Sequence, residues 1–202
     1  MKPTNQKHSD VWMTTKRIET LVDGIFAIAM TLLVLSLNVP QIPSPVTDAA
    51  VLKSLASMWG QFFVYFMSFV LLATFWRINH SQFYLIKKTD QTLLWINVIW
   101  LLFVALVPFS TNFVGDYGYL TVPILFFDLN LFMIGVLFNL NWRYAVKHNF
   151  IDEDVDQEHI QSNIRLNLIL PVTALAAAGL SFITPEYSSL VYFSIFFVRR
   201  IF

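Results

Sequence analysis

The stretch RIETLVDGIFAIAMTLLVLSLNV, residues 17–39, decides how the rest of the chain is interpreted. It begins with an arginine, places Asp23 about one turn into an apolar run, and then carries only Thr31 and Ser36 as polar residues up to Leu37. A carboxylate this close to an apolar helix of membrane length is costly unless it has a partner, so such groups are functional candidates. We therefore expect this helix to line an ion pathway.

The composition indicates a polytopic membrane protein. Of the 202 residues, 56% are hydrophobic, 20 are Phe and only 13% are charged. This is too little charge to cover the surface of a soluble domain, and several apolar runs approach or exceed the roughly 20 residues that span a bilayer. The chain has no cysteine, which excludes disulfides and thiolate metal sites.

Apolar runs between polar or helix-breaking segments predict an all-α protein with six transmembrane helices. The expected spans are Leu21–Val39, Val51–Ile78, Leu93–Val114, Leu120–Tyr144, Ile164–Ile183 and Tyr187–Val198. The last covers only about 18 Å at a rise of 1.5 Å per residue, so local thinning of the bilayer or snorkelling of the following arginines must accommodate it. A re-entrant end is the alternative.

The basic residues predict the orientation and the domain plan. With six spans and an internal N-terminus, Lys53 is the one external residue among the 13 Lys and Arg. Because Lys and Arg concentrate in cytoplasmic loops, both termini are expected to be cytosolic, in a multi-pass protein of the cell membrane. Residues 1–16 lack the apolar core of a signal peptide and are expected to be a cytosolic tail, followed by a single six-helix transmembrane domain over residues 17–202.

Polar residues from three predicted helices share the depth of the cytosolic end. Arg17 and Asp23 lie on the first helix, His80 at the end of the second, and Asn97 about one turn into the third. Arg17 and Asp23 are about 120° apart around a helix, so each is expected to reach a neighbouring helix. We hypothesise that Asp23 contacts His80 or Asn97. The alternative is independent snorkelling to the interface.

Asp128, in the outer half of the fourth span, is a second intramembrane acid. It could be a proton or cation site, but we favour a structural role, either a hydrogen-bonded helix contact or an acid near the external interface, because the sequence shows no partner for such a site. Together, Asp23 and Asp128 leave open a secondary transporter or proton-coupled carrier, although the paired broken helices of inverted repeats are missing. A membrane protein with a structural or assembly role is a further alternative.

Other signals carry no function. The sequence VGDYGY, residues 114–119, lacks the contiguous filter sequence and preceding pore helix of a carbonyl filter, and is expected to be a turn. The four histidines show no metal-ligand spacing, and phosphate-binding and nucleophile motifs are missing. We therefore expect no enzyme, no cofactor, no bound metal, and neither a nucleic-acid nor a soluble partner.

Three motifs in the first half of the chain match one known pattern. They are Arg17-x-x-x-Leu21-Val22-Asp23 before GIFAIAMTLLVL, FWRINH at 75–80, and a third-helix segment from LWIN at 94–97 to PFST at 108–111. Their combination resembles the transmembrane protein 175 family of potassium channels in its bacterial form, with one six-helix repeat per chain. Leu21 and Val22 replace the Phe and Ser of the family's Arg-x-x-x-Phe-Ser-Asp signature, so any network that uses the serine hydroxyl must be rearranged here.

The resemblance implies a homotetramer in membrane lipid, with the first helix of each subunit around a central pore and apolar rings in place of a carbonyl filter. Gly24, Ile28, Thr31 and Leu35 follow i, i+4, i+7, i+11 spacing and share one helix face. Periodicity alone does not select this stripe because nearly every position is apolar. The assignment rests on the resemblance and on Thr31 as the polar residue near mid-helix.

The expected mechanism is passive, potassium-preferring cation conduction of modest selectivity. Rings of Ile28 and Leu35 would gate by dewetting, and Thr31 hydroxyls would supply oxygens to the permeating potassium ion. The alternative role of Thr31 is a bond to the carbonyl of Ala27 within its own helix. On this view Asp23 is a structural anchor of the first helix rather than an ion ligand.

Overall fold

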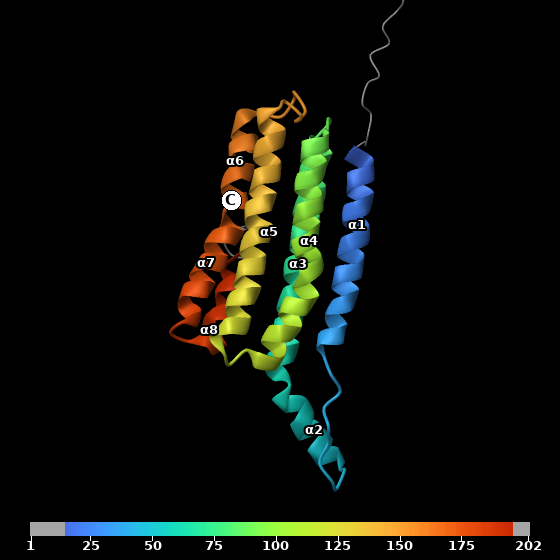
Figure 1. Cartoon of the computed structure of the whole chain (residues 1–202), viewed down its shortest axis with the longest axis vertical. Helices are drawn as coiled ribbons and strands as arrows, with labels where there is room; N and C mark the ends of the chain where they lie inside the picture. Colours follow the sequence, from blue (N-terminus) through green and yellow to red (C-terminus); the bar gives the residue numbers. More distant parts are fainter. Residues whose placement is uncertain (1–14, 196–202) are drawn as a thin grey trace, which may run out of the picture.

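Five long helical segments lie side by side in a bundle and follow the order of the apolar runs (Figure 1). The computed structural model describes residues 15–195. Each of the five segments is long and apolar enough to cross a membrane. They are α1 (Thr15–Leu32) with its 3₁₀ extension η1 (Leu33–Ser36), α3 (Trp59–Leu85), α4 (Gln91–Tyr117), α5 (Thr121–Lys147), and α6 (Gln157–Asn167) with α7 (Ile169–Ser181).

Polar residues just before the helices supply their N-terminal caps. Asp90 accepts a hydrogen bond from the backbone N–H of Leu93 at 2.8 Å at the start of α4. Asp156 accepts from the N–H of His159 at 2.6 Å at the start of α6. Such side chains satisfy the N–H groups that the first helical turn leaves free, so polar loop residues help to fix where these helices begin.

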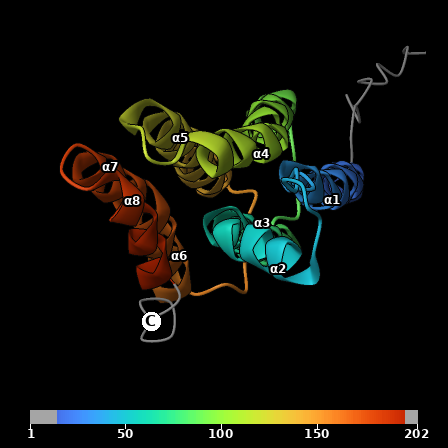
Figure 2. The same cartoon turned by 90° about the horizontal axis from the view of Figure 1, so that it is seen from below.

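The helix α5 lies between α4 and α7 and packs against both of them (Figure 2). Gly135 permits the close approach of α7, because a Cβ atom at this position would lie 2.5 Å from Cδ and 2.9 Å from the backbone N of Pro171. Phe127, Leu131 and Trp142 are at most 1% exposed. Most of the circumference of α5 is therefore interior.

The helices extend beyond the predicted spans and break where hydropathy shows no boundary. The second predicted span, Val51–Ile78, falls on α2 (Asp48–Ser57) and α3, which are separated at Met58. Hydropathy does not detect this break because neither a proline nor a charge marks it. The break after Asn167 has a clear cause, because Pro171 lacks an N–H and its ring crowds the carbonyl four residues earlier.

Two other boundaries differ from the predictions. The first helix, with its 3₁₀ extension, ends at Ser36 instead of Val39. Residues 115–117, which we expected in a turn, belong to the last turn of α4, and the chain turns only after Tyr117. Polar residues at the bilayer surface can continue a helix into water, which is why a hydropathy boundary is not a helix boundary.

The sixth predicted span is not established by the structure. Its described part forms a four-residue helix α8 (Pro185–Ser188) and the 3₁₀ helix η2 (Ser189–Phe193). Residues 196–202, with the two terminal arginines, lie outside the described residues, as does the predicted tail over residues 1–14. The described chain therefore has five candidate spans where the sequence predicted six.

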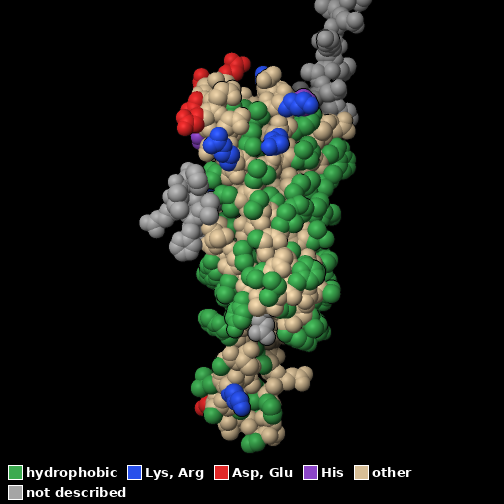
Figure 3. Space-filling model, turned by 90° about the vertical axis from the view of Figure 1, so that its left-hand side faces the viewer, with side chains coloured by type: hydrophobic (Ala, Val, Ile, Leu, Met, Phe, Trp, Pro, Cys, Tyr) green, Lys and Arg blue, Asp and Glu red, His purple; other side chains and the backbone are tan. Residues whose placement is uncertain are grey.

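Charged side chains gather at one end of the bundle, around the α5–α6 connection (Figure 3). At the opposite end, α2 carries the basic residue Lys53. The apolar belt between the two ends agrees with a membrane-spanning bundle. The direction in which the bundle crosses the membrane remains the prediction made from the Lys and Arg count.

Candidate pore face and its anchor

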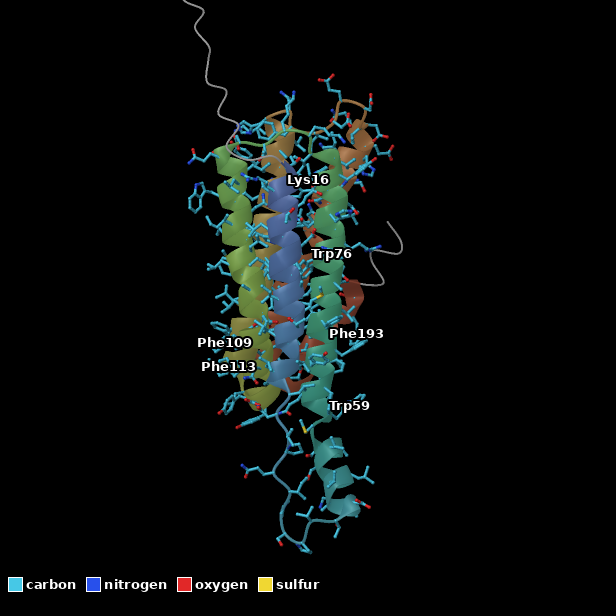
Figure 4. The ribbon with its side chains drawn as sticks, turned by 90° about the vertical axis from the view of Figure 1, so that its right-hand side faces the viewer. Lys16, Trp59, Trp76, Phe109, Phe113 and Phe193 are labelled. Atoms are coloured by element: carbon cyan, nitrogen blue, oxygen red, sulfur yellow. The ribbon has the colours of Figure 1, made fainter. Side chains whose placement is uncertain are left out.

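The helix α1 is fixed to the bundle by one face. It lies in front of α3 and α4, between the two in the view of Figure 4, and contacts both helices. Ile18, Val22, Phe26, Ala29 and Leu33 are at most 2% exposed and recur every three or four residues. The Phe26 ring lies 5.5 Å, centroid to centroid, from the ring of Trp100 on α4. This packing determines which face of α1 points away from the bundle.

The four residues of the predicted pore stripe all lie on that outward face. Gly24, Ile28, Thr31 and Leu35 are exposed, with Ile28 57% and Leu35 68% exposed. A Cβ atom at Gly24 would meet nothing within 4 Å. No residue in the described part of the chain covers the stripe, so it is available to lipid or to another subunit. The structure places the stripe on one free surface without itself identifying a pore.

The hydroxyl of Thr31 bonds to its own helix. Its Oγ1 lies 3.0 Å from the carbonyl oxygen of Ala27 and 2.8 Å from that of Ile28. The local role that we considered for Thr31 is therefore present in the single chain. A hydroxyl has one proton and two acceptor lone pairs. Donation to the backbone therefore leaves the oxygen able to coordinate a cation on the exposed face.

Asp23 has a different partner from the two that we hypothesised. The indole Nε1 of Trp76 on α3 donates a hydrogen bond to Asp23 Oδ1 at 2.8 Å. His80 does not bond to Asp23 but stacks on Trp76, with ring centroids 6.1 Å apart. Trp76 precedes His80 by one helical turn, and this puts its indole within reach of the carboxylate. One of the two hypothesised partners, His80, lies on the helix that supplies the donor, but neither of them is the donor itself.

Asn97 belongs to another contact. It is 1% exposed, and its Nδ2 donates to Asn141 Oδ1 of α5 at 3.0 Å, while Asn141 returns a bond of 3.3 Å. Two amides satisfy each other because each has donors and an acceptor. The hypothesis that Asn97 contacts Asp23 is therefore wrong. The sequence could have indicated Asn141 as the partner of Asn97, because Asn141 lies near the cytosolic end of the next predicted span.

The predicted cytosolic network is thus only partly assembled. Asp23 and His80 are brought together through Trp76, whereas Asn97 joins α4 to α5. Arg17 is exposed, and no described residue forms an ion pair with it. Arg17 lies at the edge of a shallow surface depression on α1. The other residues that border this depression are Thr20, Leu21, Gly24, Ile25 and Ile28.

Asp128 forms a buried contact on the other side of the bundle. It is 1% exposed, and the hydroxyl of Tyr192 in η2 donates to its Oδ1 at 2.7 Å. This is the hydrogen-bonded contact, one of the two structural roles that we favoured, with a partner that the sequence did not indicate. Asp23 bonds to α3 and Asp128 to η2, so the two acids do not share a site. A carrier that couples both carboxylates gains no support from this arrangement.

Comparisons with known proteins match the chain to channels. A family model described as the endosomal/lysosomal potassium channel TMEM175 matches residues 17–108. A potassium channel of Chamaesiphon minutus is 31% identical over 192 residues, which cover 92% of this chain and 94% of the relative. The mouse endosomal/lysosomal proton channel TMEM175 is 30% identical over 103 residues, which cover 48% of this chain and 21% of the mouse protein.

Two solved structures share the fold. The crystal structure of a lysosomal potassium-selective channel TMEM175 homolog from Chamaesiphon minutus has a TM-score of 0.80 at 30% identity, over 92% of this chain and 97% of that one. A variant of the potassium channel MtTMEM175, crystallised in complex with a nanobody fusion protein, has a TM-score of 0.62 at 21% identity, over 92% of each chain. The second likeness concerns the fold alone.

Proposed function

The chain belongs to the TMEM175 family of ion channels, and on this premise we propose that it forms a homotetrameric cation channel with a modest preference for potassium. The family is one of channels and not of enzymes. With five candidate spans, the chain is an integral multi-pass membrane protein. The finer points of assembly, pore lining and selectivity are our proposal.

The outward face of α1 carries the proposal. Its stripe of Gly24, Ile28, Thr31 and Leu35 lies uncovered within a helix whose opposite face is held by α3 and α4. Most of this helix lies in the segment that the family model matches. Four copies of α1 around an axis would cover each other's free faces and leave the stripe around a central path. The position of α1 at the edge of the bundle supports this arrangement.

Apolar rings form the proposed constriction. Ile28 and Leu35 present branched side chains on the same face, and such rings close a narrow pore to water. Thr31 lies between them, and its hydroxyl oxygen keeps lone pairs after donating to the backbone. Four such oxygens replace part of the hydration shell of a potassium ion. Selectivity of this kind is modest because no complete cage of carbonyl groups surrounds the ion.

The bond between Asp23 and Trp76 acts as the anchor of α1. It joins α1 to α3 at 2.8 Å and lies within the length of the bundle, below the level of Lys16 (Figure 4). Because the carboxylate is satisfied by an indole N–H of the same chain, we assign it a positioning role and not an ion-ligand role. The concentration of basic residues at the end of the bundle where charged side chains gather supports cytosolic termini in the cell membrane.

Recording from the purified protein in planar bilayers under a potassium gradient tests the proposal. Resolved single-channel steps that reverse near the potassium equilibrium potential are expected. Slow, saturable flux without steps would favour the carrier, and lack of any flux would favour a structural role. Chemical cross-linking, or images of single particles, tests the number of subunits separately, with four expected.

A further inference from the structure

The helix α2 projects beyond the bundle (Figures 1 and 4). It has ten residues, Asp48–Ser57, and none of them is buried. It is nevertheless a well-formed helix, because the side chain of Thr47 caps its start by accepting from the N–H of Ala50 at 3.2 Å. Asp48 in the first turn adds a favourable charge at the positive end of the helix dipole.

One face of α2 is apolar. Val51, Leu52, Leu55 and Ala56 cluster on it at helical spacing, and Asp48 lies at its N-terminal end. The polar residues of the sequence KS at 53–54 and of Ser57 lie on the opposite face. Leu52 is 68% exposed and Leu55 is 44% exposed. The linker over residues 37–47 runs beside α2 (Figure 1) but leaves both leucines uncovered. This apolar face of α2 has no partner among the described residues.

The position of Trp59 argues against lipid tails as the cover of this face. With 27 residues, α3 alone is about 40 Å long at 1.5 Å per residue, whereas the hydrocarbon core of a bilayer is about 30 Å thick. Trp59, 74% exposed at the first position of α3, is a residue type that marks the membrane surface. Since α2 precedes Trp59 and points away from the bundle, its leucines lie on the aqueous side of that surface.

A short helix of this kind needs a packing partner. Isolated helices shorter than about 12–15 residues are marginal in water, and two exposed leucines oppose solvation further. Since the described chain does not supply the partner and the position of Trp59 argues against lipid tails, another macromolecule is the expected cover of the apolar face. The linker ties α2 directly to the end of η1, so any assembly of α1 helices around an axis brings copies of α2 together at one end.

We propose that the apolar face of α2 packs against a neighbouring copy of the same chain and that the copies form a collar at the external entrance of the pore. This inference rests on the proposed tetramer. Asp48 and Lys53 give each α2 one acid and one base. In a ring, each interface joins two different surfaces, so the acid of one copy can meet the base of the next. Charge therefore favours a copy of this chain as the occupant.

Cysteine cross-linking tests the collar. Because the chain has no cysteine of its own, any cross-link between copies must involve the introduced residue. The variants Leu52→Cys and Leu55→Cys probe the apolar face, Ser57→Cys is the matched control on the polar face, and Leu35→Cys probes the pore stripe of η1. Each is treated in membranes with a short bismaleimide and separated on a denaturing gel. For Leu52→Cys and Leu55→Cys, the amount of cross-linked product, from dimer up to tetramer, is expected to be at least severalfold larger than for Ser57→Cys.

The outcomes separate the collar from the channel proposal. The collar would be overturned, and the tetramer left in place, if Leu35→Cys formed cross-links while Leu52→Cys and Leu55→Cys formed no more cross-linked product than Ser57→Cys. Absence of cross-links at all four positions, together with a monomer mass in detergent, would overturn both. Cross-linking of α2 only to a different protein would also refute the collar. As a second measure, Leu52→Ser with Leu55→Ser is expected to raise the dissociation constant of the oligomer about tenfold, that is about 1.4 kcal/mol.

Discussion

Helices α1 and α5 are both long and apolar, but the bundle uses them in opposite ways. In the most apolar stretch of each, 28% of the residues are buried in α1 with η1, against 56% in α5. A helix enclosed by its own chain finds hydrogen-bond partners for its polar side chains within that chain. A helix attached by one face can instead present polar groups on its free face, to lipid or to another subunit. Hydrophobicity alone does not distinguish the two roles.

The polar side chains of α5 show the first situation. Asn139 donates to the carbonyl of Ile164 at 3.0 Å, and Asn141 exchanges bonds with Asn97. Asp128 accepts from Tyr192. On α1, by contrast, Thr31 bonds only within its own helix and remains exposed. We infer that α5 holds the subunit together and that α1 works between subunits.

The largest expected effect on conduction distinguishes the exposed residues of the two helices. Ile28 on α1 is 57% exposed and Leu129 on α5 is 59% exposed. Replacing Ile28 by Asn should wet the constriction and raise the potassium current by about tenfold or more, equivalent to about 1.4 kcal/mol of barrier. Leu129→Asn should leave the current per channel unchanged because this exposed residue lies on α5, off the proposed pore face.

The current per channel in bilayers, with reconstitution matched by protein amount, measures both variants. Equal currents in Ile28→Asn and in the parent would remove Ile28 from the pore. A matching increase in Leu129→Asn would show that the effect is not specific to the face of α1. Either result would break the contrast between the helices.

Two glycines make a matched pair for stability. Gly135→Ala places a Cβ atom against Pro171 and should destabilise the fold by about 1–3 kcal/mol through overpacking. Gly24→Ala adds a Cβ in open space and should be neutral or stabilise the helix by up to about 1 kcal/mol. Thermal unfolding in detergent, monitored by size-exclusion chromatography after heating, compares them. Similar midpoints for the two variants would contradict the tight approach of α5 and α7.

The anchor of α1 is tested by a double-mutant cycle of Asp23→Asn and Trp76→Phe. Removal of a hydrogen bond to a charged group predicts a coupling energy of about 1.5–3 kcal/mol, measured from unfolding free energies. The cycle of Asp23→Asn with His80→Ala is the control, because His80 stacks on the indole without reaching the carboxylate. A larger coupling to His80 than to Trp76 would overturn the bond found in the structure.

The smallest expected effect concerns Thr31. Thr31→Ala should lower the potassium-to-sodium permeability ratio severalfold, whereas Thr31→Ser, which keeps the hydroxyl, should retain it. Thr74→Ala on α3 is the control, because Thr74 makes the same kind of bond to its own helix, 2.8 Å from the carbonyl of Val70, but lies off the stripe. Reversal potentials in mixed potassium and sodium solutions measure the ratio. Unchanged selectivity in Thr31→Ala would leave its hydroxyl a purely local role.

The individual helices show which parts of the fold could be predicted from the sequence. Four long spans and the fifth apolar region were found because hydropathy reports transfer into lipid. Their ends were missed, since a helix such as α3 continues through polar residues to Leu85. The separate helix α2 was also missed because nothing in the sequence at Met58 marks the break. Membership of a channel family followed from motifs whose combination is specific even though each one is short.

The sequence by itself determined that the chain is an apolar, multi-pass helical protein with the motifs of its channel family. The tertiary structure alone decided which side chains meet, because contacts depend on the rotation of each helix about its axis and a uniformly apolar sequence does not encode this rotation visibly. Thus Asp23 meets Trp76, Asn97 meets Asn141, and Asp128 meets Tyr192. The same packing turns Ile28 and Thr31 outward, where another copy of the chain can reach them.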